Sequence, residues 1–209
     1  MEYIGPFRQG GFILDTERIG KNSIVYSLGV GDNVEWDKEM IERFGCNIYA
    51  YDPDPRAIAW FQKQTMPPEF HFHPLGVSNF AGVQTFYQPH RSTKVDASTV
   101  RKTPFIERLP VARLASIMRQ NGHSHIDVLK VNIEGTEFAI LPDIIKIKPK
   151  QLIIEFHGRY LRYTGAVRTF LARIQLFLAG YRQFALDGHT RSYAIRGSLA
   201  EGPISLPAH

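Results

Sequence analysis

The chain has 209 residues, enough for about one domain with a hydrophobic core of normal size. Its hydrophobic fraction of 44%, its charged fraction of 22% and its net charge of +5 are ordinary for a globular protein. A single cysteine, Cys46, excludes an internal disulfide framework and a cysteine-rich zinc site, and it predicts a reducing, cytoplasmic location. We expect neither a secretory signal nor a membrane span, because no basic segment precedes an apolar stretch and no window holds about 18 apolar residues.

Strand and helix patterns alternate from residue 23 onward. Short apolar runs rich in β-branched and aromatic residues predict strands; they lie at 24–28, 47–52, 70–77, 83–87, 126–131 and 151–157. Apolar residues three or four apart predict helices; they lie at 36–44, from Pro55 to Pro67, at 111–121 and at 166–179. Segments 181–186 and 191–195 flank an Asp187-Gly188 turn and predict an antiparallel hairpin. This order predicts an α/β fold, a Rossmann-like, doubly wound and mostly parallel sheet with an antiparallel hairpin at one edge.

Three further expectations concern the organisation of the chain. Residues 1–22 are expected to form an extension or hairpin, residues 23–196 the domain, and residues 197–209 a flexible tail. Residues 88–110 are polar, basic and interrupted by proline, which predicts a long loop. The helix at 166–179 should carry one apolar stripe on a single face; the stripe consists of Val167, Leu171, Ile174 and Leu178.

The first candidate site follows the first predicted strand. Gly29 and Gly31 stand between that strand and the next helix, where a backbone without side chains lets a ligand approach. Asp52 ends the second strand about 20 residues after Gly31, the position from which a carboxylate binds ribose hydroxyls. A tight turn with an unrelated aspartate is the alternative, but the two features in register favour nucleotide binding.

The start of the next helix decides which nucleotide is expected. Asp32, Glu35 and Asp37 would repel a pyrophosphate at this helix N-terminus, although they also suit the helix dipole. S-adenosylmethionine (SAM) has no phosphate and carries a positive sulfonium and an ammonium. We therefore expect SAM rather than a dinucleotide. A dehydrogenase or epimerase is the runner-up, and the missing third glycine, at Val34, argues against it.

Polar residues alternate at the end of the strand at 126–131. Lys130, Asn132 and Glu134 should share one face at the same edge of the sheet as Gly29. A charge within a parallel strand is costly unless it is paired or functional, so Lys130 and Glu134 are candidate catalytic residues. A structural Lys–Glu pair is the alternative.

The segment from Lys130 to Glu137 resembles the signature of the FkbM family of SAM-dependent methyltransferases, which is roughly Lys-x-Asp-x-Glu-Gly-x-Glu. Asn132 departs from it, because the family usually has Asp there. The segments at 27–32, 44–47, 51–53, 73–77, 111–114 and 153–157 also resemble the family, so the likeness covers about residues 10–195. It implies a class I methyltransferase fold, a cofactor site that includes Gly76, Val77 and Asn132, and methyl transfer to a hydroxyl of a sugar or other small molecule.

A hydroxyl acceptor benefits from a base near the sulfonium. Asn132 cannot take a proton, which leaves His157 and Glu134 as candidates. His157 ends the strand at 151–157, shares a face with Glu155, and has an unperturbed pKa near neutrality, so we expect it to be the base. Glu134 is then assigned to the methionine ammonium of SAM or to orienting the acceptor. A histidine bonded to a backbone carbonyl is the alternative.

Other readings remain open at this point. Because Asn132 replaces the usual Asp, a non-catalytic scaffold subunit that binds SAM is an alternative function. Glu134, Glu137, Glu155 and His157 would suit a magnesium ion, but with Asn132 in place of Asp we expect no metal. Six basic residues against two acidic ones between positions 89 and 113 suggest either a lid for an acidic or phosphorylated acceptor or a solvated charge run. Few aromatic residues interleave with them, so no nucleic-acid partner is expected.

Overall fold

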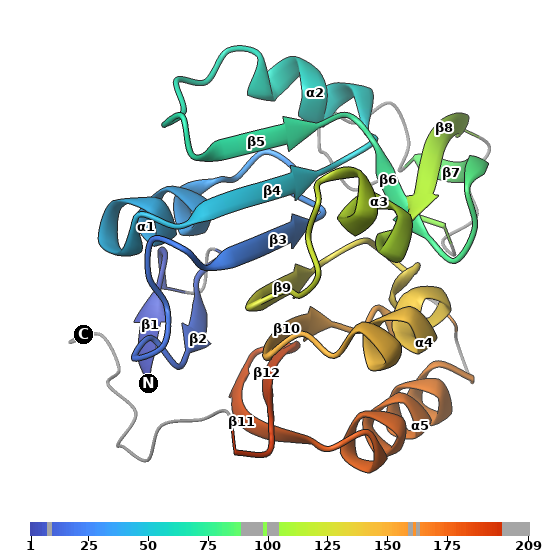
Figure 1. The fold of residues 1–209 in the computed structure, drawn as a ribbon. Coiled ribbons are helices and arrows are strands. Elements are labelled where there is room, and N and C mark those ends of the chain that lie inside the picture. The colour runs from blue at the N-terminus through green and yellow to red at the C-terminus, as the bar shows by residue number, and fades with distance from the viewer. Residues whose placement is uncertain (8–9, 89–97, 100–104, 159–160, 162–163, 198–209) are drawn as a thin grey trace.

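The computed structural model describes residues 1–7, 10–88, 98–99, 105–158, 161 and 164–197. Seven of the described strands form one sheet (Figure 1). In spatial order these are β11 (Tyr181–Asp187), β12 (Thr190–Ile195), β10 (Gln151–Glu155), β9 (Val128–Val131), β3 (Ile24–Leu28), β4 (Asn47–Tyr51) and β5 (Phe70–His73). The five strands from β10 to β5 are parallel, whereas β12 is antiparallel to both of its neighbours. The α/β class and the antiparallel hairpin predicted from the sequence are thus confirmed.

Helices cover both faces of the sheet. One face carries α1 (Glu35–Phe44) and α2 (Pro55–Phe61), and the other carries α3 (Leu114–Gln120), α4 (Glu137–Ile147) and α5 (Gly165–Leu178) (Figure 1). Two of the caps are those that the residue types favour. Gly45 ends α1 in the left-handed conformation, and the Asp54 carboxylate accepts a hydrogen bond from the Arg56 N–H at the start of α2. The helix α2 ends at Phe61, before the Pro67–Pro68 pair that the sequence suggested as its end.

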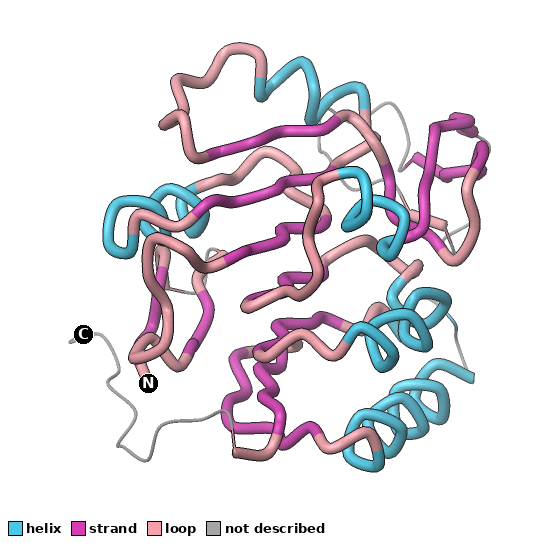
Figure 2. Tube along the Cα trace, viewed as in Figure 1, coloured by secondary structure: helices cyan, strands magenta, loops and turns pink. Residues whose placement is uncertain are grey.

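The chain order reverses between β3 and β9. From β3 the chain steps outward to β4 and β5, and from β9 it steps the other way to β10. The loops leaving the parallel strands gather at one edge of the sheet, the right-hand edge in Figure 2. In open α/β sheets a ligand binds in the crevice at such a reversal, outside the carboxyl ends of the strands. The fold therefore locates the site beside the ends of β3 and β9.

Two predicted boundaries are wrong at this edge. The strand expected at 70–77 divides into β5 and β6 (Gly76–Ser78), because Pro74 and Leu75 carry the chain out of the main sheet. The strand β6 pairs with β8 (Phe105–Arg113), which pairs in turn with β7 (Gly82–Gln88). Residues 105–110 are thus strand rather than loop, and 111–113 end that strand rather than begin α3. The rest of the predicted loop, residues 89–97 and 100–104, lies outside the described residues.

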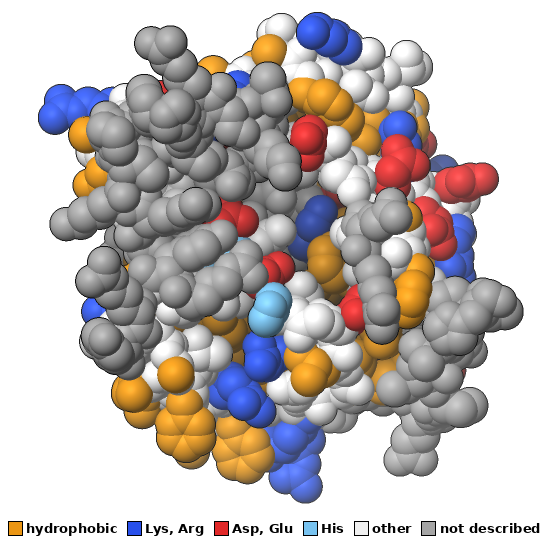
Figure 3. Space-filling view, turned by 180° about the vertical axis from the view of Figure 1, so that it is seen from behind, with side chains coloured by type: hydrophobic (Ala, Val, Ile, Leu, Met, Phe, Trp, Pro, Cys, Tyr) orange, Lys and Arg blue, Asp and Glu red, His pale blue; other side chains and the backbone are white. Residues whose placement is uncertain are grey.

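The apolar stripe of α5 points outward, although such a stripe ordinarily faces the core. Its four side chains are exposed, and Leu178 is 76% exposed; they are Val167, Leu171, Ile174 and Leu178. The face against the sheet consists of Gly165, Ala172 and Leu176. Because α5 is apolar on most sides, its periodicity does not identify the inner face; the small residues allow the closest approach to the sheet. Apolar side chains consequently gather along the lower edge of Figure 3.

The first residues form a hairpin of β1 (Glu2–Ile4) and β2 (Phe12–Leu14), which packs beside α1. Among the described residues no helix is long and apolar enough to span a membrane. The division at residues 22 and 196 stays a prediction, and residues 198–209 of the predicted tail lie outside the described part.

Candidate active site

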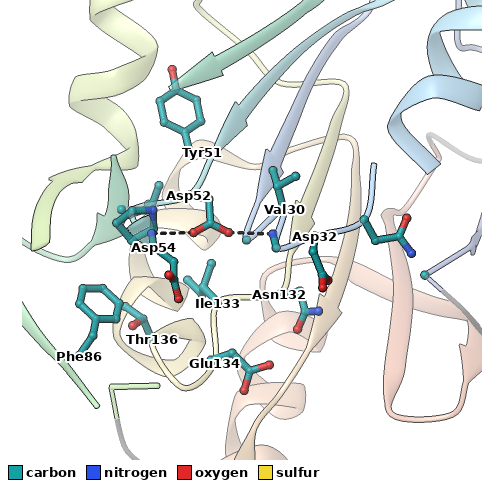
Figure 4. Close-up of a pocket in the computed structure, with 17 residues that line it drawn as sticks. Val30, Asp32, Tyr51, Asp52, Asp54, Phe86, Asn132, Ile133, Glu134 and Thr136 are labelled. Carbon is teal, nitrogen blue, oxygen red and sulfur yellow. Dashed lines mark hydrogen bonds between the residues drawn. The ribbon is translucent and has the colours of Figure 1, made fainter. Parts of the chain in front are cut away.

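A cavity of about 290 Å³ lies at the reversal between β3 and β9 (Figure 4). This is close to the lower limit of the range of roughly 300–1,000 Å³ found for small-molecule sites. Its walls come from the loops after β3, β4 and β9 and from the three-stranded sheet of β6, β8 and β7. Among the candidate residues, it is lined by Gly29, Gly31, Asp52, Gly76, Val77, Asn132 and Glu134. The structure therefore brings all the predicted cofactor residues to one place.

Gly29 and Gly31 form the floor that their position in the sequence suggested. Both have positive φ, 79° and 63°, which L side chains rarely adopt. A Cβ atom on Gly29 would lie 1.8 Å from the carbonyl oxygen of Asn132. The end of β3 and the end of β9 thus approach each other too closely for any side chain at residue 29.

Asp52 is buried, and its carboxylate is held by two backbone groups. Oδ2 accepts from the Gly31 N–H at 2.8 Å, and Oδ1 accepts from the Asp54 N–H at 2.9 Å (Figure 4). Burial raises the pKa of Asp52 to about 6, although these N–H groups oppose the rise. The carboxyl is fixed in orientation and remains charged at neutral pH. Each of its oxygens has further acceptor capacity.

Asn132 and Glu134 bring unpartnered polar atoms to the cavity. Among the described residues, Asn132 Oδ1 and Glu134 Oε2 are buried without a hydrogen-bond partner. Glu134 has φ 52°, a strained conformation that costs on the order of 1–3 kcal/mol in a residue other than glycine. Its carbonyl oxygen is held by the Ser98 hydroxyl at 2.7 Å and the Thr99 N–H at 3.2 Å. Buried unpartnered acceptors at a strained residue are typical of a ligand site.

His157 does not line the cavity but lies behind Glu134. Its side chain is buried, with Nε2 3.1 Å from Glu134 Oε1 and Nδ1 2.7 Å from Glu137 Oε1. Glu155 Oε1 lies 3.6 Å from Nε2, in the neighbouring position that the strand pattern predicted. Burial alone would lower the pKa of His157, but hydrogen bonds to Glu134 and Glu137 and their charges raise it to about 10. The argument that chose His157 as base, a pKa near neutrality, is therefore wrong.

Lys130 lies on the other side of the sheet from these residues. Its Nζ is 3.4 Å from Oδ2 of the fully buried Asp37 and 5.0 Å from the centre of the Trp36 ring. The expectation that Lys130 shares a face with Asn132 and Glu134 is wrong, because the chain turns sharply once β9 ends at Val131. Of the three acids expected at the start of the helix after β3, Asp32 lines the cavity, whereas Asp37 is buried against Lys130.

The side chains considered as magnesium ligands do not surround a common point. Three of them, Glu134, Glu137 and Glu155, lie around the imidazole of the fourth, His157. Within the described part of the chain no group of three or more acidic, histidine or cysteine side chains is arranged to hold a metal ion. Arg113, at the end of the basic segment, forms an ion pair with Asp143, with Nη2 2.6 Å from Oδ1. This contact joins β8 to α4 and gives Arg113 a structural role. Arg91, Lys94, Arg101 and Lys102 lie outside the described residues.

Some of the cavity wall gave no signal in the sequence. Phe86 reaches the cavity from β7, and Thr136 and Ile133 reach it from the turn after β9. The sequence indicated Glu137 as the last residue of the family motif and as a possible metal ligand, but it did not predict α4, the helix that Glu137 begins. The Gly135 N–H donates to both oxygens of Glu137, a contact between residues two positions apart that a spacing rule does not reveal.

The fold and this site together define a Rossmann-like methyltransferase of class I. The profile of the methyltransferase FkbM domain matches residues 15–182, so the chain belongs to the FkbM methyltransferase family. The resemblance found in the sequence motifs is confirmed, and with it SAM as the cofactor of the family.

Curated relatives and a solved structure agree with this assignment. The probable methyltransferase-like protein 24 of Rattus norvegicus is 27% identical over 141 residues, and the protein of Homo sapiens with the same description is 27% identical over 144 residues. Each match covers 66% of this chain and 33% of the relative, so the chain spans about a third of their length. The Methanococcus jannaschii fibrillarin pre-rRNA processing protein superimposes with a TM-score of 0.52 at 10% identity, covering 89% of this chain and 70% of that one. That likeness shows the fold alone.

Proposed function

We propose that the chain transfers the methyl group of SAM to a hydroxyl of a small molecule or sugar. The observation that carries the proposal is the cavity, where a glycine floor, a fixed carboxylate and two unpartnered oxygens meet at the reversal of the sheet. These residues fit SAM. In this proposal Asp52 accepts the ribose hydroxyls, Gly29 and Gly31 admit the cofactor close to the backbone, and Gly76, Val77 and Asn132 complete the cofactor site.

SAM supplies an electrophilic methyl group, and the chain must then bind, orient and deprotonate the acceptor. Glu134 is the candidate that faces the cavity. Its Oε1 is bonded to His157, whereas Oε2 is available to accept the proton of a hydroxyl. His157 is buried and protonated, so its role is to position Glu134, with Glu137 completing the chain of hydrogen bonds. A base held by two further groups is the arrangement that nucleophile activation commonly uses.

Two measurements test this function. SAM and S-adenosylhomocysteine should bind in calorimetry, whereas NAD should not. The chain should then transfer a ¹³C-labelled methyl from SAM to hydroxylated compounds, and the carbon shift of the product distinguishes O-methyl from N-methyl and S-methyl groups. Binding of SAM without transfer to any hydroxylated compound would favour a non-catalytic subunit instead. Binding of NAD in place of SAM would contradict the proposal altogether.

A further inference from the structure

A second cavity, of about 370 Å³, lies at the same edge of the sheet between α5, the end of β10 and the β11–β12 turn. Its lining combines two aromatic rings, two glycines, a hydroxyl and three basic side chains. The lining residues with functional side chains are Phe156, Thr169, Phe170, Arg173, His189 and Arg191. Figure 3 shows basic side chains beside a histidine on the lower half of this face, next to the apolar side chains of the lower edge.

The two arginines have no carboxylate partner among the described residues. Asp187 and Glu155, the acids at the ends of the flanking strands, are bonded to other groups: Asp187 accepts from the Tyr3 hydroxyl, and Glu155 accepts from the Thr190 hydroxyl. Arg191 donates to the His189 carbonyl oxygen, which fixes its guanidinium beside the turn. Two guanidinium groups that have planar donor forks and no carboxylate partner among the described residues favour phosphate or carboxylate as a ligand.

Both arginines line this cavity. Burial raises the pKa of Tyr193, and the charges of Arg191 and Arg173 and a side-chain hydrogen bond from Arg173 oppose that rise. Two like charges in one cavity repel each other unless an anion lies between them. The positive potential of the cavity is therefore unbalanced by the described residues.

The start of α5 is held rigidly against the cavity. A Cβ on Gly165 would lie 1.7 Å from the carbonyl oxygen of Gly158, so the two backbones are in direct contact. This contact places the first turn of the 14-residue helix, with its free N–H groups, in the cavity wall. The helix N-terminus adds to the positive potential that the arginines supply.

A short series of residues links the second cavity to the proposed cofactor cavity. Phe156 lines the second cavity, and the next residue, His157, is bonded to Glu134, which lines the first. We propose that the second cavity binds an oxyanion of the methyl acceptor, a phosphate or carboxylate, while the acceptor hydroxyl lies at Glu134. This assignment rests on the function proposed above. Phe156 and Phe170 would then contact an apolar part of the same molecule.

Binding of inorganic phosphate tests the cavity without turnover. Addition of the chain at low ionic strength should broaden the ³¹P resonance of inorganic phosphate. Arg173→Gln or Arg191→Gln should weaken the affinity for phosphate roughly tenfold, as the loss of a charged hydrogen bond predicts. Arg168→Gln, on the same helix but outside the cavity lining, is the matched control and should bind phosphate normally. All three variants should bind SAM as the unmodified chain does. Absence of phosphate binding, or equal binding by all variants, would overturn the cavity assignment.

Matched acceptors test the second half of the proposal. Each hydroxylated sugar is assayed with and without a phosphate or carboxylate group, and the anionic member of a pair should show the higher kcat/KM. Arg173→Gln and Arg191→Gln should raise the KM for the anionic member and remove its advantage. Phosphate binding without any preference for anionic acceptors would overturn the acceptor assignment. If no hydroxylated compound is methylated, the proposed function fails and the acceptor assignment with it, while phosphate binding still decides whether the cavity takes oxyanions.

Discussion

The Nε2 atom of His157 lies 3.1 Å from Oε1 of Glu134, and this contact joins a buried imidazolium to the one cavity carboxylate whose second oxygen has no partner among the described residues. The two residues follow the ends of two adjacent parallel strands, Glu134 after β9 and His157 after β10. In the proposed function His157 is therefore a positioning residue, and Glu134 is the group that meets the acceptor.

Exchange of Glu134 for Gln should lower kcat by about 10²–10⁴-fold, the usual contribution of a general base. The hydrogen bond to His157 can persist through the amide oxygen, so the fold should be retained. SAM affinity, measured by calorimetry, should stay unchanged. A loss of SAM binding in Glu134→Gln would instead assign this carboxylate to the methionine ammonium.

His157→Gln should act on kcat through Glu134. Both donors of the amide lie on one nitrogen, so they do not reproduce the two separate ring nitrogens that contact Glu134 and Glu137. We therefore expect a smaller loss of kcat than in Glu134→Gln, with SAM affinity and the KM for the acceptor unchanged. If His157 were itself the base, its replacement would cost at least as much as that of Glu134. Parallel kcat measurements on the two variants, with chemistry rate-limiting, decide between these roles.

The same histidine should make stability depend on pH. Its pKa is about 10 in the folded chain and near 6.5 when unfolded, so its contribution is fully present below pH 6.5 and is lost as the pH rises toward 10. The free energy of unfolding by urea should therefore fall between pH 6.5 and 9.5 by an amount on the order of a few kcal/mol. His157→Gln should flatten this dependence, whereas His189→Gln, at an exposed turn, should not.

Asp52 predicts a pH dependence of cofactor binding. Its carboxyl must be charged to accept two ribose hydroxyls, and its pKa is raised to about 6. The affinity for SAM should be constant above pH 7 and weaken below pH 6, by up to about tenfold for each further pH unit. Asp52→Asn should bind about ten- to a hundredfold more weakly at pH 8, with no such dependence. Unchanged binding by this variant would contradict the ribose assignment.

The orientation of α5 predicts a contrast between two leucines two positions apart. Leu176 is fully buried, so Leu176→Ala should lower the free energy of unfolding by about 2–5 kcal/mol. Leu178 is 76% exposed, and Leu178→Ala should change it by less than about 0.5 kcal/mol. Urea denaturation of both variants checks this. A larger loss of stability in Leu178→Ala than in Leu176→Ala would show that the apolar stripe with Leu178 faces the core.

Apart from α4 and β8, local sequence patterns determined the order of elements, and they also determined the parts of the site that follow directly from strand ends. The pairs Gly29 with Gly31 and Asp54 with Pro55 mark turns and helix starts through backbone preferences of their own, and Asp52 reaches the cavity because parallel strands end at one edge. These features depend on neighbouring residues, which a sequence displays directly. The family motif from Lys130 to Glu137 is likewise contiguous.

Only the tertiary structure decided which side chains share an environment. The pKa of His157 depends on carboxylates from two other elements, and Lys130 is neutralised by Asp37, 93 positions earlier in the chain. The inner face of α5 was decided by how closely Gly165 and Ala172 approach the sheet, since apolar residues surround most of the helix. Burial and long-range charge pairing depend on all the elements packed around a residue. The periodicity of a single element therefore could not determine them.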